Sequence, residues 1–398
     1  MPSARARGLL DYLRSCRAEM YEALERLVAA ESPSQDPASQ ADVQATLTQE
    51  LEASGFRVRR LPGHETGGHL LAVPRERSRH QCVQALIGHC DTVWPRGTLG
   101  TMPITIRAGR MTGPGIYDMK GGLVLMIFAL RAIAEQGLEP EVLPVVFINS
   151  DEELGSGESR RTVERLSKIA DRILVLEPAM GETGALKTAR KGVGQFRIRV
   201  SGKAAHAGLE PSQGVSAILE LSHVVQKLFA LNDPTNGITV NVGTIDGGLR
   251  PNVVAPESTA DIDVRVLTTQ QAREVEAAIR SLEPETPGAV LRVEGHVDIP
   301  PLERTPRNRL LWRRAQAVAA ELELELEECL AGGGSDGNVA SLFAPTLDGL
   351  GPVGAGAHAL HEFIELDSMV ERGALLALLL LEPPLNWRAE LGSQVAES

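Results

Sequence analysis

Histidine and carboxylate side chains recur along this chain at positions where proteins commonly hold metal ions. Each lies at the end of a strand-like run or in a glycine-rich segment. In chain order they are His89, Asp91, Asp118, Glu152, Glu153, Glu177 and His358. Imidazole nitrogens and carboxylate oxygens are good ligands for a divalent ion such as zinc. The set is what a hydrolase needs to hold two metal ions, with one carboxylate left to act as a base.

The triplet His89-Cys90-Asp91 follows an apolar run at residues 83–88. Side chains alternate across a strand, so His89 and Asp91 are expected to point to one side and Cys90 to the other. If His89 binds a metal, Asp91 is placed to hold the other ring nitrogen and fix the orientation of the ring. Taken alone, this triplet is better explained as a histidine and a turn-forming aspartate at a strand end.

The other carboxylates also have ordinary explanations when each is taken alone. Asp118 can be the N-cap of a helix, and Glu152-Glu153 can be an acidic helix start favoured by the helix dipole. However, adjacent carboxylates repel one another, which a cation would relieve. In an open parallel sheet, ligands bind beyond the carboxyl ends of the strands, where this pair is expected. The joint occurrence of these residues, in this order, favours a metal site.

Composition and charge narrow the class of protein. A chain of 398 residues is expected to form two domains, and a net charge of -12 argues against a nucleic-acid partner. The four cysteines have neither zinc-ribbon nor disulfide-framework spacing. The longest apolar run, residues 374–381, is too short to span a bilayer, and the N-terminus lacks an apolar signal core. We expect a cytoplasmic protein with no membrane contact.

Two patterns of apolar and polar residues follow one another along the chain. Helices are expected at residues 9–30, 39–54 and 121–136, with strands at 82–88, 142–149 and 173–176. This alternation predicts a mostly parallel sheet covered on both faces. From about residue 191, apolar and polar residues alternate, which is typical of strands with one face exposed to solvent. We expect strands at 195–200, 238–245, 260–266 and 290–297, with helices at 215–231 and 269–282. That order, β-α-β-β-α-β, is the ferredoxin-like unit.

After residue 300 the pattern of the N-terminal part returns, with an expected helix at 307–322 and a glycine-rich loop at 332–337. The simplest organisation is therefore an α/β catalytic domain interrupted by a small α+β lid. We assign residues 1–190 and 299–398 to the two parts of the catalytic domain and residues 191–298 to the lid.

The chain after about residue 80 resembles the dizinc aminoacylase/carboxypeptidase family, most closely its glutamate carboxypeptidase branch of the folate-hydrolysing type. The motifs that carry the resemblance are residues 88–93, 113–122, 150–153, 177–178, 202–208 and 356–358. The resemblance implies a zinc-peptidase (phosphorylase/hydrolase-like) α/β catalytic domain with an inserted ferredoxin-like lid, and a homodimer formed through that lid.

The resemblance also implies the metal ligands. Asp118 would bridge two Zn²⁺ ions, for which Co²⁺ or Mn²⁺ can substitute. His89 and Glu153 would complete one metal site, and Glu177 and His358 the other.

Further roles follow from the same resemblance. Glu152 would be the general base, and Asp91 would orient His89. His206, on the lid, would reach across the dimer and polarise the substrate carbonyl in the partner's site. Asn241 and Arg250 would bind the free carboxylate of the substrate. Backbone amides of the loop at 332–335, represented by Gly333, would add donors.

The resulting hypothesis is a metallocarboxypeptidase that cleaves the amide bond before a C-terminal amino acid, with glutamate as a candidate. Residues 295–301 lack an arginine that would suit a glutamate side chain, so the residue released stays open. The alternative is a deacylase of N-acyl-amino acids, of the acetylornithine or succinyl-diaminopimelate type. An inactive relative used for binding is disfavoured, because a binding module has no need for a base beside its metals.

Overall fold

The computed structural model describes residues 2–76 and 82–389 and divides the chain into two compact units. The first unit contains residues 1–188, 304–330 and 335–398, and the second contains residues 189–303 and 331–334. The division expected from the sequence had its boundaries at 190/191 and 298/299. It also kept residues 331–334 with the first unit, whereas here they go with the second.

A six-stranded sheet forms the centre of the first unit. Its strands, in spatial order, are β1 (Phe56–Leu61), β2 (His69–Pro74), β6 (Leu143–Asn149), β3 (Val83–His89), β7 (Ala170–Val175) and β14 (Thr346–Leu347). Strand β3 pairs in parallel with β6 and β7, as the sequence predicted. Strand β14, which was not predicted, pairs in parallel with β7. Strands β1 and β2 form an antiparallel hairpin, and β2 also pairs antiparallel with β6. This hairpin was not predicted from the sequence.

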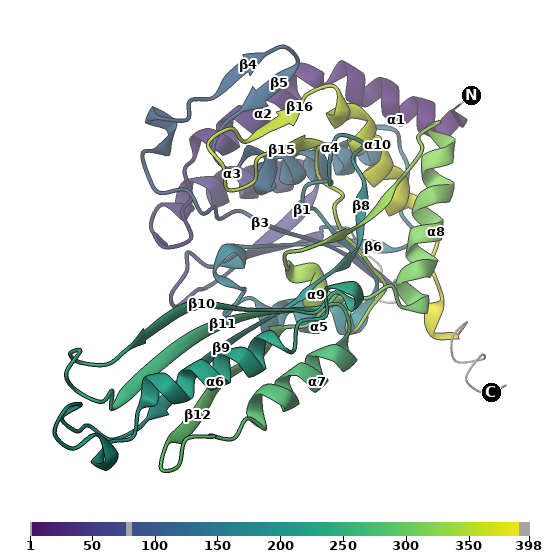
Figure 1. Cartoon of the computed structure of the whole chain (residues 1–398). Coiled ribbons are helices and arrows are strands. Elements are labelled where there is room, and N and C mark those ends of the chain that lie inside the picture. Colours follow the sequence, from purple (N-terminus) through teal and green to yellow (C-terminus); the bar gives the residue numbers. More distant parts are fainter. Residues whose placement is uncertain (1, 77–81, 390–398) are drawn as a thin grey trace. The chain divides into compact units, whose positions relative to one another are not determined.

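The central strands are apolar on both faces because helices cover both. Along β3, Ala85 and Ile87 pack into one hydrophobic cluster and Leu86 into the other. The larger cluster contains helices α1 (Ala4–Ser15), α2 (Arg17–Ala29), α3 (Gln40–Ala53), α4 (Gly121–Glu135), α8 (Pro306–Glu321) and α10 (Ser368–Leu381). The smaller cluster contains α5 (Arg160–Ile169) and α9 (Asp336–Ala340), which lie across the sheet from α4 and α10 in Figure 1.

One helical prediction needs correction. The single helix expected at residues 9–30 is two helices, α1 and α2, because the chain leaves helical geometry at Cys16. The apolar run at 374–381 is the buried part of α10, which packs against α1 and α4. No helix among the described residues is both long and apolar enough to cross a membrane.

A small antiparallel sheet in the first unit brings distant loops together. Its strands, in order, are β15 (Gly354–Ala355), β16 (Phe363–Glu365), β5 (Arg110–Thr112) and β4 (Thr105–Arg107). The hairpin formed by β15 and β16 therefore lies beside β5, which leads directly into the glycine-rich segment before α4. The sequence analysis did not predict this sheet. A further two-stranded sheet pairs β8 (Leu186–Arg190) with β13 (Glu328–Ala331).

The second unit is a four-stranded antiparallel sheet with two helices. The strands, in spatial order, are β10 (Thr239–Gly247), β11 (Glu257–Val266), β9 (Gly192–Ser201) and β12 (Val290–Ile299), and the helices are α6 (Ala217–Phe229) and α7 (Thr269–Arg280). Along β9, Ile198 is buried while Arg197 and Arg199 are exposed. Helices α6 and α7 pack on the buried face (Figure 1). The ferredoxin-like prediction is confirmed, including a sheet with one face covered by helices and the other exposed to solvent.

Candidate metal centre

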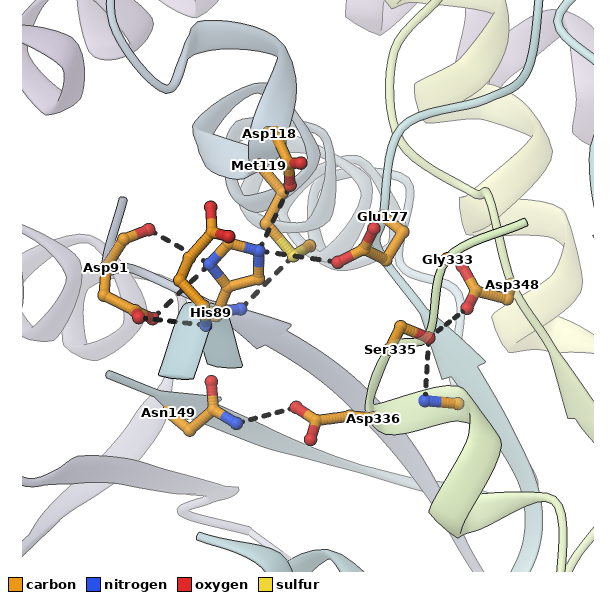
Figure 2. A network of polar contacts seen from close by, with 12 residues as sticks. His89, Asp91, Asp118, Met119, Asn149, Glu177, Gly333, Ser335, Asp336 and Asp348 are labelled. Carbon is orange, nitrogen blue, oxygen red and sulfur yellow. Dashed lines mark hydrogen bonds and ion pairs between the residues drawn. The ribbon is translucent and has the colours of Figure 1, made fainter. Parts of the chain in front are cut away.

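The candidate ligands gather at the carboxyl ends of the parallel strands. His89 is the last residue of β3, and in the β3–β6 register it lies opposite Asn149, the last residue of β6. Glu177 lies two residues beyond the end of β7. Because these strands run in parallel, their ends meet at one edge of the sheet. Figure 2 shows the side chains that converge there around His89.

The ring of His89 is buried and contacts acidic groups on both sides. Its Nε2 lies 3.2 Å from Oδ1 of Asp118 and 3.4 Å from Oε1 of Glu177. Its Nδ1 lies 3.0 Å from the backbone oxygen of Asp91 and 3.4 Å from Oδ1 of the same residue (Figure 2). Asp91 thus contacts the ring nitrogen that faces away from Asp118, and its backbone oxygen is the closer of the two contacts.

Asp91 is itself held by residues from other loops. Its side chain is fully buried, and Oδ2 accepts hydrogen bonds from the hydroxyl of Ser34 at 2.7 Å and from the backbone N–H of Glu153 at 3.3 Å. Ser34 was not predicted from the sequence, because it lies in an irregular segment with no motif of its own. Its contact with Asp91 links the candidate ligand His89 to the loop after α2.

Asp118 lies between the two histidines of the candidate set. Its Oδ1 faces His89, and its Oδ2 lies 3.5 Å from Nε2 of His358. The N-cap position of α4 is occupied by Lys120, and no side chain caps that helix. The capping explanation for Asp118 is therefore wrong, and its carboxylate points into the cluster instead.

His358 reaches the cluster from the turn of the β15–β16 hairpin. The residue has a positive φ of 60°, and its side chain is half exposed. Its Nε2 lies 3.1 Å from Oε2 of Glu153. Local sequence patterns could not have predicted this contact, since it depends on the pairing of β16 with β5.

These contacts group the candidates differently from the expected division. His89 pairs with Asp118 and Glu177, whereas His358 pairs with Asp118 and Glu153. The expectation had placed Glu153 with His89 and Glu177 with His358. All of these residues nevertheless form one cluster: ligand atoms of His89, Asp118 and Glu153 lie within 4.8 Å of one another, as do those of His89, Glu152 and Glu177.

Glu152 lies in the short 3₁₀ turn Glu152–Leu154 that follows β6. The turn is closed by backbone hydrogen bonds from Gly155 to Glu152 and from Ser156 to Asp151. Its carboxylate is close to His89 and Glu177. The two adjacent glutamates therefore contact different partners, Glu153 facing His358 and Glu152 facing the His89 side.

The electrostatics of the cluster reflect dense packing of like charges. Burial opposes protonation of His89, but hydrogen bonds to Asp118, Asp91 and Glu177 outweigh it and raise the pKa of His89 well above its usual value. Hydrogen bonds to Asp118 and Glu153 raise the pKa of His358 to about 10.

The pKa values of the two adjacent glutamates are also raised, which for a carboxyl group favours the neutral form. Burial, followed by the charge of Glu177, raises the pKa of Glu152 well above its usual value. Burial also raises the pKa of Glu153. A cation bound nearby would favour the charged form of both glutamates.

The cluster fits a divalent cation. Oε1 of Glu153 is buried and has no hydrogen-bond partner among the described residues, although a buried charged oxygen needs compensation. The available donors are carboxylate oxygens and imidazole nitrogens, the set that zinc prefers in catalytic sites. A cation at the centre would supply the missing partner for Glu153.

A second polar network lies beside the cluster. Asn149 donates to Oδ2 of Asp336 at 2.6 Å (Figure 2). It also donates to the hydroxyl of Ser159 at 3.0 Å. The hydroxyl of Ser156 donates to Oδ1 of Asp336 at 2.6 Å. The sequence analysis noted the glycines at 332–337 but did not consider Asp336. A carboxylate after a glycine-rich loop was the only signal for it.

The remaining site candidates belong to the second unit. His206, Asn241 and Arg250 are exposed, and Nδ1 of His206 accepts hydrogen bonds from the backbone N–H groups of Gly208 and Leu209 at 3.1 and 3.2 Å. The carbonyl of Gly333 accepts a hydrogen bond from the Arg190 guanidinium at 3.2 Å.

One part of the expected donor loop belongs to the first unit and is already engaged. The backbone N–H of Ser335 donates to Oδ1 of Asn338 at 2.9 Å, within a capping box at the start of α9. This amide therefore does not have a free hydrogen, and it is not available to a substrate in this conformation.

The family model described as Peptidase family M20/M25/M40 matches residues 85–382. The chain belongs to this family. Its members are hydrolases that act on amide bonds, so the chain is a metallopeptidase-type hydrolase. The matched segment includes every candidate metal ligand, from His89 to His358.

Individual relatives agree with this assignment. The chain is 28% identical to carboxypeptidase G2 from Pseudomonas sp. (strain RS-16) over 90% of this chain and 88% of that protein. It is 27% identical to succinyl-diaminopimelate desuccinylase from Acidovorax ebreus, over 86% of this chain and 92% of that protein.

Solved structures share the fold. Aminopeptidase PepT from Bacillus cereus matches with a TM-score of 0.74 and 21% identity, over 92% of this chain and 98% of that one. The YXEP protein of Bacillus subtilis, a dinuclear metal-binding peptidase of the M20 family, matches with a TM-score of 0.65 and 14% identity, over the same shares.

Proposed function

We propose that this protein is a two-metal carboxypeptidase that hydrolyses the amide bond before a C-terminal amino acid, with glutamate as the leading candidate. The position of Asp118 between His89 and His358 carries this proposal. One carboxylate that faces two separate histidines suits two metal ions rather than one. We propose Zn²⁺ as the native ion, with Co²⁺ or Mn²⁺ as substitutes, because the donors are nitrogen and oxygen.

We assign the ligands by their contacts. Asp118 is the shared ligand, with His89 and Glu177 on one side and His358 and Glu153 on the other. This division replaces the one expected from the sequence. Each ion would then be held by one histidine, one carboxylate of its own and Asp118.

Glu152 then remains as the general base. The bound ions would activate a water molecule and polarise the scissile carbonyl. Glu152 accepts the proton of that water and delivers it to the leaving amine. Burial raises the pKa of Glu152, and the charge of bound cations would counter this rise, so that the carboxylate can begin the reaction unprotonated. Asp91 keeps the ring of His89 in one orientation.

His206 is proposed to stabilise the oxyanion. Both backbone donors of its turn point at Nδ1, so a neutral ring carries its hydrogen on Nε2 and can donate it. A donor of this kind typically contributes about 3–4 kcal/mol to the transition state. We place His206 in the site of the partner chain, in a homodimer formed through the lid. Asn241, Arg250 and Gly333 are proposed to bind the substrate.

Complementation between two inactive variants tests action across a dimer. His206→Ala and Glu152→Ala homodimers are each expected to be inactive, but exchange of subunits produces mixed dimers. In a mixed dimer, the chain with intact Glu152 receives His206 from its partner. Complete exchange should restore about a quarter of the wild-type activity. Absence of any recovery, with mixed dimers demonstrated by mass, would place His206 in its own chain's site or outside catalysis.

A deacylase is the second candidate, favoured by the similarity to succinyl-diaminopimelate desuccinylase over most of both chains. A panel of N-acylglutamates, folate-type conjugates and C-terminal peptides, compared with N-acetylornithine and N-succinyl-diaminopimelate, separates the two. Higher kcat/KM on the first group supports the carboxypeptidase. Hydrolysis of only the small acyl substrates would establish the deacylase instead.

Metal content tests the two-metal centre directly. The active protein, dialysed against metal-free buffer and analysed by elemental mass spectrometry, should contain two zinc-class ions per chain. Activity in protein with a single ion per chain would contradict the shared role of Asp118.

A further inference from the structure

Glu362 is a fully buried carboxylate that accepts hydrogen bonds from several N–H groups at once. Its Oε1 accepts from the backbone of Tyr117 at 2.8 Å and of Asp118 at 3.0 Å. Its Oε2 accepts from the backbone of Gly115 at 3.0 Å and from the indole of Trp94 at 2.9 Å. Asp118 is the proposed shared metal ligand. Glu362 therefore holds the backbone that determines where the Asp118 side chain points.

The position of Glu362 links two candidate ligands. It directly precedes β16, on the same hairpin that carries His358 at its turn. Strand β16 pairs with β5, and the chain continues from β5 to Asp118. Glu362 therefore joins the loop that carries His358 to the loop that carries Asp118.

The loop around Asp118 depends on this outside acceptor. Asp118 has non-helical dihedral angles inside the turn Ile116–Lys120, so regular helical hydrogen bonding is interrupted there. Gly115 has a φ of 70°, and a Cβ at this position would lie 2.4 Å from the Thr92 side chain, so the loop fits closely against its neighbour. Buried N–H groups without partners would cost free energy, and Glu362 satisfies those of this loop.

We infer that Glu362 is a positioning residue of the metal centre: it fixes the direction of the Asp118 carboxylate and keeps the His358 loop in register with it. The inference rests on the proposed two-metal function. Removing the carboxylate would let the backbone at Asp118 rotate, and the ion held by both Asp118 and His358 would then be bound less tightly. Groups that orient metal ligands in this way typically change metal affinity by about 10–100-fold when mutated.

A purely structural role is the competing explanation, and the chain offers a matched control for it. Glu220 on α6 is also fully buried, and it accepts backbone hydrogen bonds from Glu285 at 3.1 Å and Thr286 at 2.6 Å. It belongs to the second unit and touches none of the proposed ligands. Its replacement by glutamine should reduce stability without changing metal affinity.

The decisive variant is Glu362→Gln, which keeps the shape but replaces one accepting oxygen with an NH₂ group that opposes the N–H donors. Titration of the metal-free protein with Zn²⁺ against a chromophoric chelator should give a Kd about 10–100-fold higher than the wild type for at least one ion. The visible spectrum of the Co²⁺ form should also change, because ligand geometry changes. Glu220→Gln should keep the wild-type Kd and spectrum.

Trp94→Phe provides a graded second test that does not remove the carboxylate. It deletes one donor to Glu362, so metal affinity should fall by less than in Glu362→Gln. This variant decides the question if Glu362→Gln does not fold. Trp312→Phe, in the hydrophobic core on α8, controls for the loss of an indole.

The outcomes separate this inference from the proposed function. Wild-type zinc affinity and an unchanged Co²⁺ spectrum in folded Glu362→Gln would overturn the role of Glu362 and leave the two-metal proposal intact. The same applies to Trp94→Phe if it alone folds and matches the wild type. A wild-type protein that binds fewer than two ions would instead refute the proposed function itself.

Discussion

The side-chain amide of Asn149 donates to Oδ2 of Asp336 over 2.6 Å, at the end of strand β6. The hydroxyl of Ser156 donates to the other oxygen of Asp336 over the same distance. Residues on both sides of the Glu152–Leu154 turn are thereby bonded to one buried carboxylate from a distant segment. Asp336 thus closes the turn that carries the proposed base.

We expect Asp336→Ala to reduce the free energy of unfolding by about 1–3 kcal/mol, because Asn149 and Ser156 would each lose a buried partner. Asp336→Asn should cost less, since an amide can accept from Asn149 and donate to the Ser156 hydroxyl. Urea denaturation of the metal-free proteins measures both values. Equal stability of Asp336→Ala and the wild type would contradict the network.

The same carboxylate predicts a pH dependence. Burial, moderated by hydrogen bonds from Ser156 and Asn149, raises the pKa of Asp336 to about 6. The folded state therefore holds this proton more tightly than the unfolded state. The stability that protonation contributes is present at low pH and is lost as the pH rises from about 4 through about 6.

Asp336→Asn cannot titrate at this position, so its difference in stability from the wild type should change across that pH range in the metal-free proteins. Relative to the variant, the wild type should become less stable as the pH rises. A difference that stays constant from pH 4 to pH 7 would mean that the pKa of Asp336 is not raised.

Glu152→Gln should retain both metal ions and lose activity. The amide cannot accept a proton from water, and general-base catalysis typically contributes about 10²–10⁴-fold to the rate. Steady-state kinetics and metal analysis on one preparation measure both properties. Glu158→Gln is the control, because Glu158 instead holds the backbone of His64 and Glu65. Wild-type kcat in Glu152→Gln would assign the base elsewhere.

Ser34→Ala should weaken metal binding moderately. Asp91 would lose its hydroxyl donor and hold His89 less firmly, and the effect should stay below the roughly 10–100-fold change expected for residues that contact a ligand directly. Ser167→Ala, which removes another buried hydroxyl on α5, should leave metal affinity unchanged. Competitive chelator titration compares the two. An identical Kd in Ser34→Ala would show that Asp91 does not need this support.

The cysteines should differ sharply in reactivity. Cys82 is exposed, whereas Cys90 is buried, and burial together with the charge of Asp91 raises the pKa of Cys90 to about 12. Because the thiolate is the reactive form, a thiol reagent at neutral pH should label Cys82 in the native protein and Cys90 only after unfolding. Peptide mapping identifies the labelled sites, with Cys82→Ser as the control. Rapid labelling of Cys90 in the native protein would contradict its burial.

Sequence reasoning succeeded where the signal is local. The alternation of Phe196, Ile198 and Val200 with polar residues predicted strand β9, and the apolar run before His89 predicted β3. Candidate ligands could be selected because they follow such strands. These predictions depend only on side-chain periodicity and on where a strand ends.

The remainder depends on contacts between distant segments. Ser34 and Asp91 are 57 positions apart, Asn149 and Asp336 are 187 apart, and Gly115 and Glu362 are 247 apart. No local pattern announces such pairs. The same holds for His358 beside Glu153, which corrected the expected grouping of the ligands.

The β15–β16 hairpin has a consequence for biosynthesis. The parallel sheet receives its last strand, β14, and the ligand cluster receives His358, only after the chain has returned from the second unit. When about the first 300 residues have left the ribosome, the candidate carboxylates are therefore present without the hairpin that carries His358. During synthesis, the candidate metal centre therefore stays incomplete until nearly the whole polypeptide has emerged.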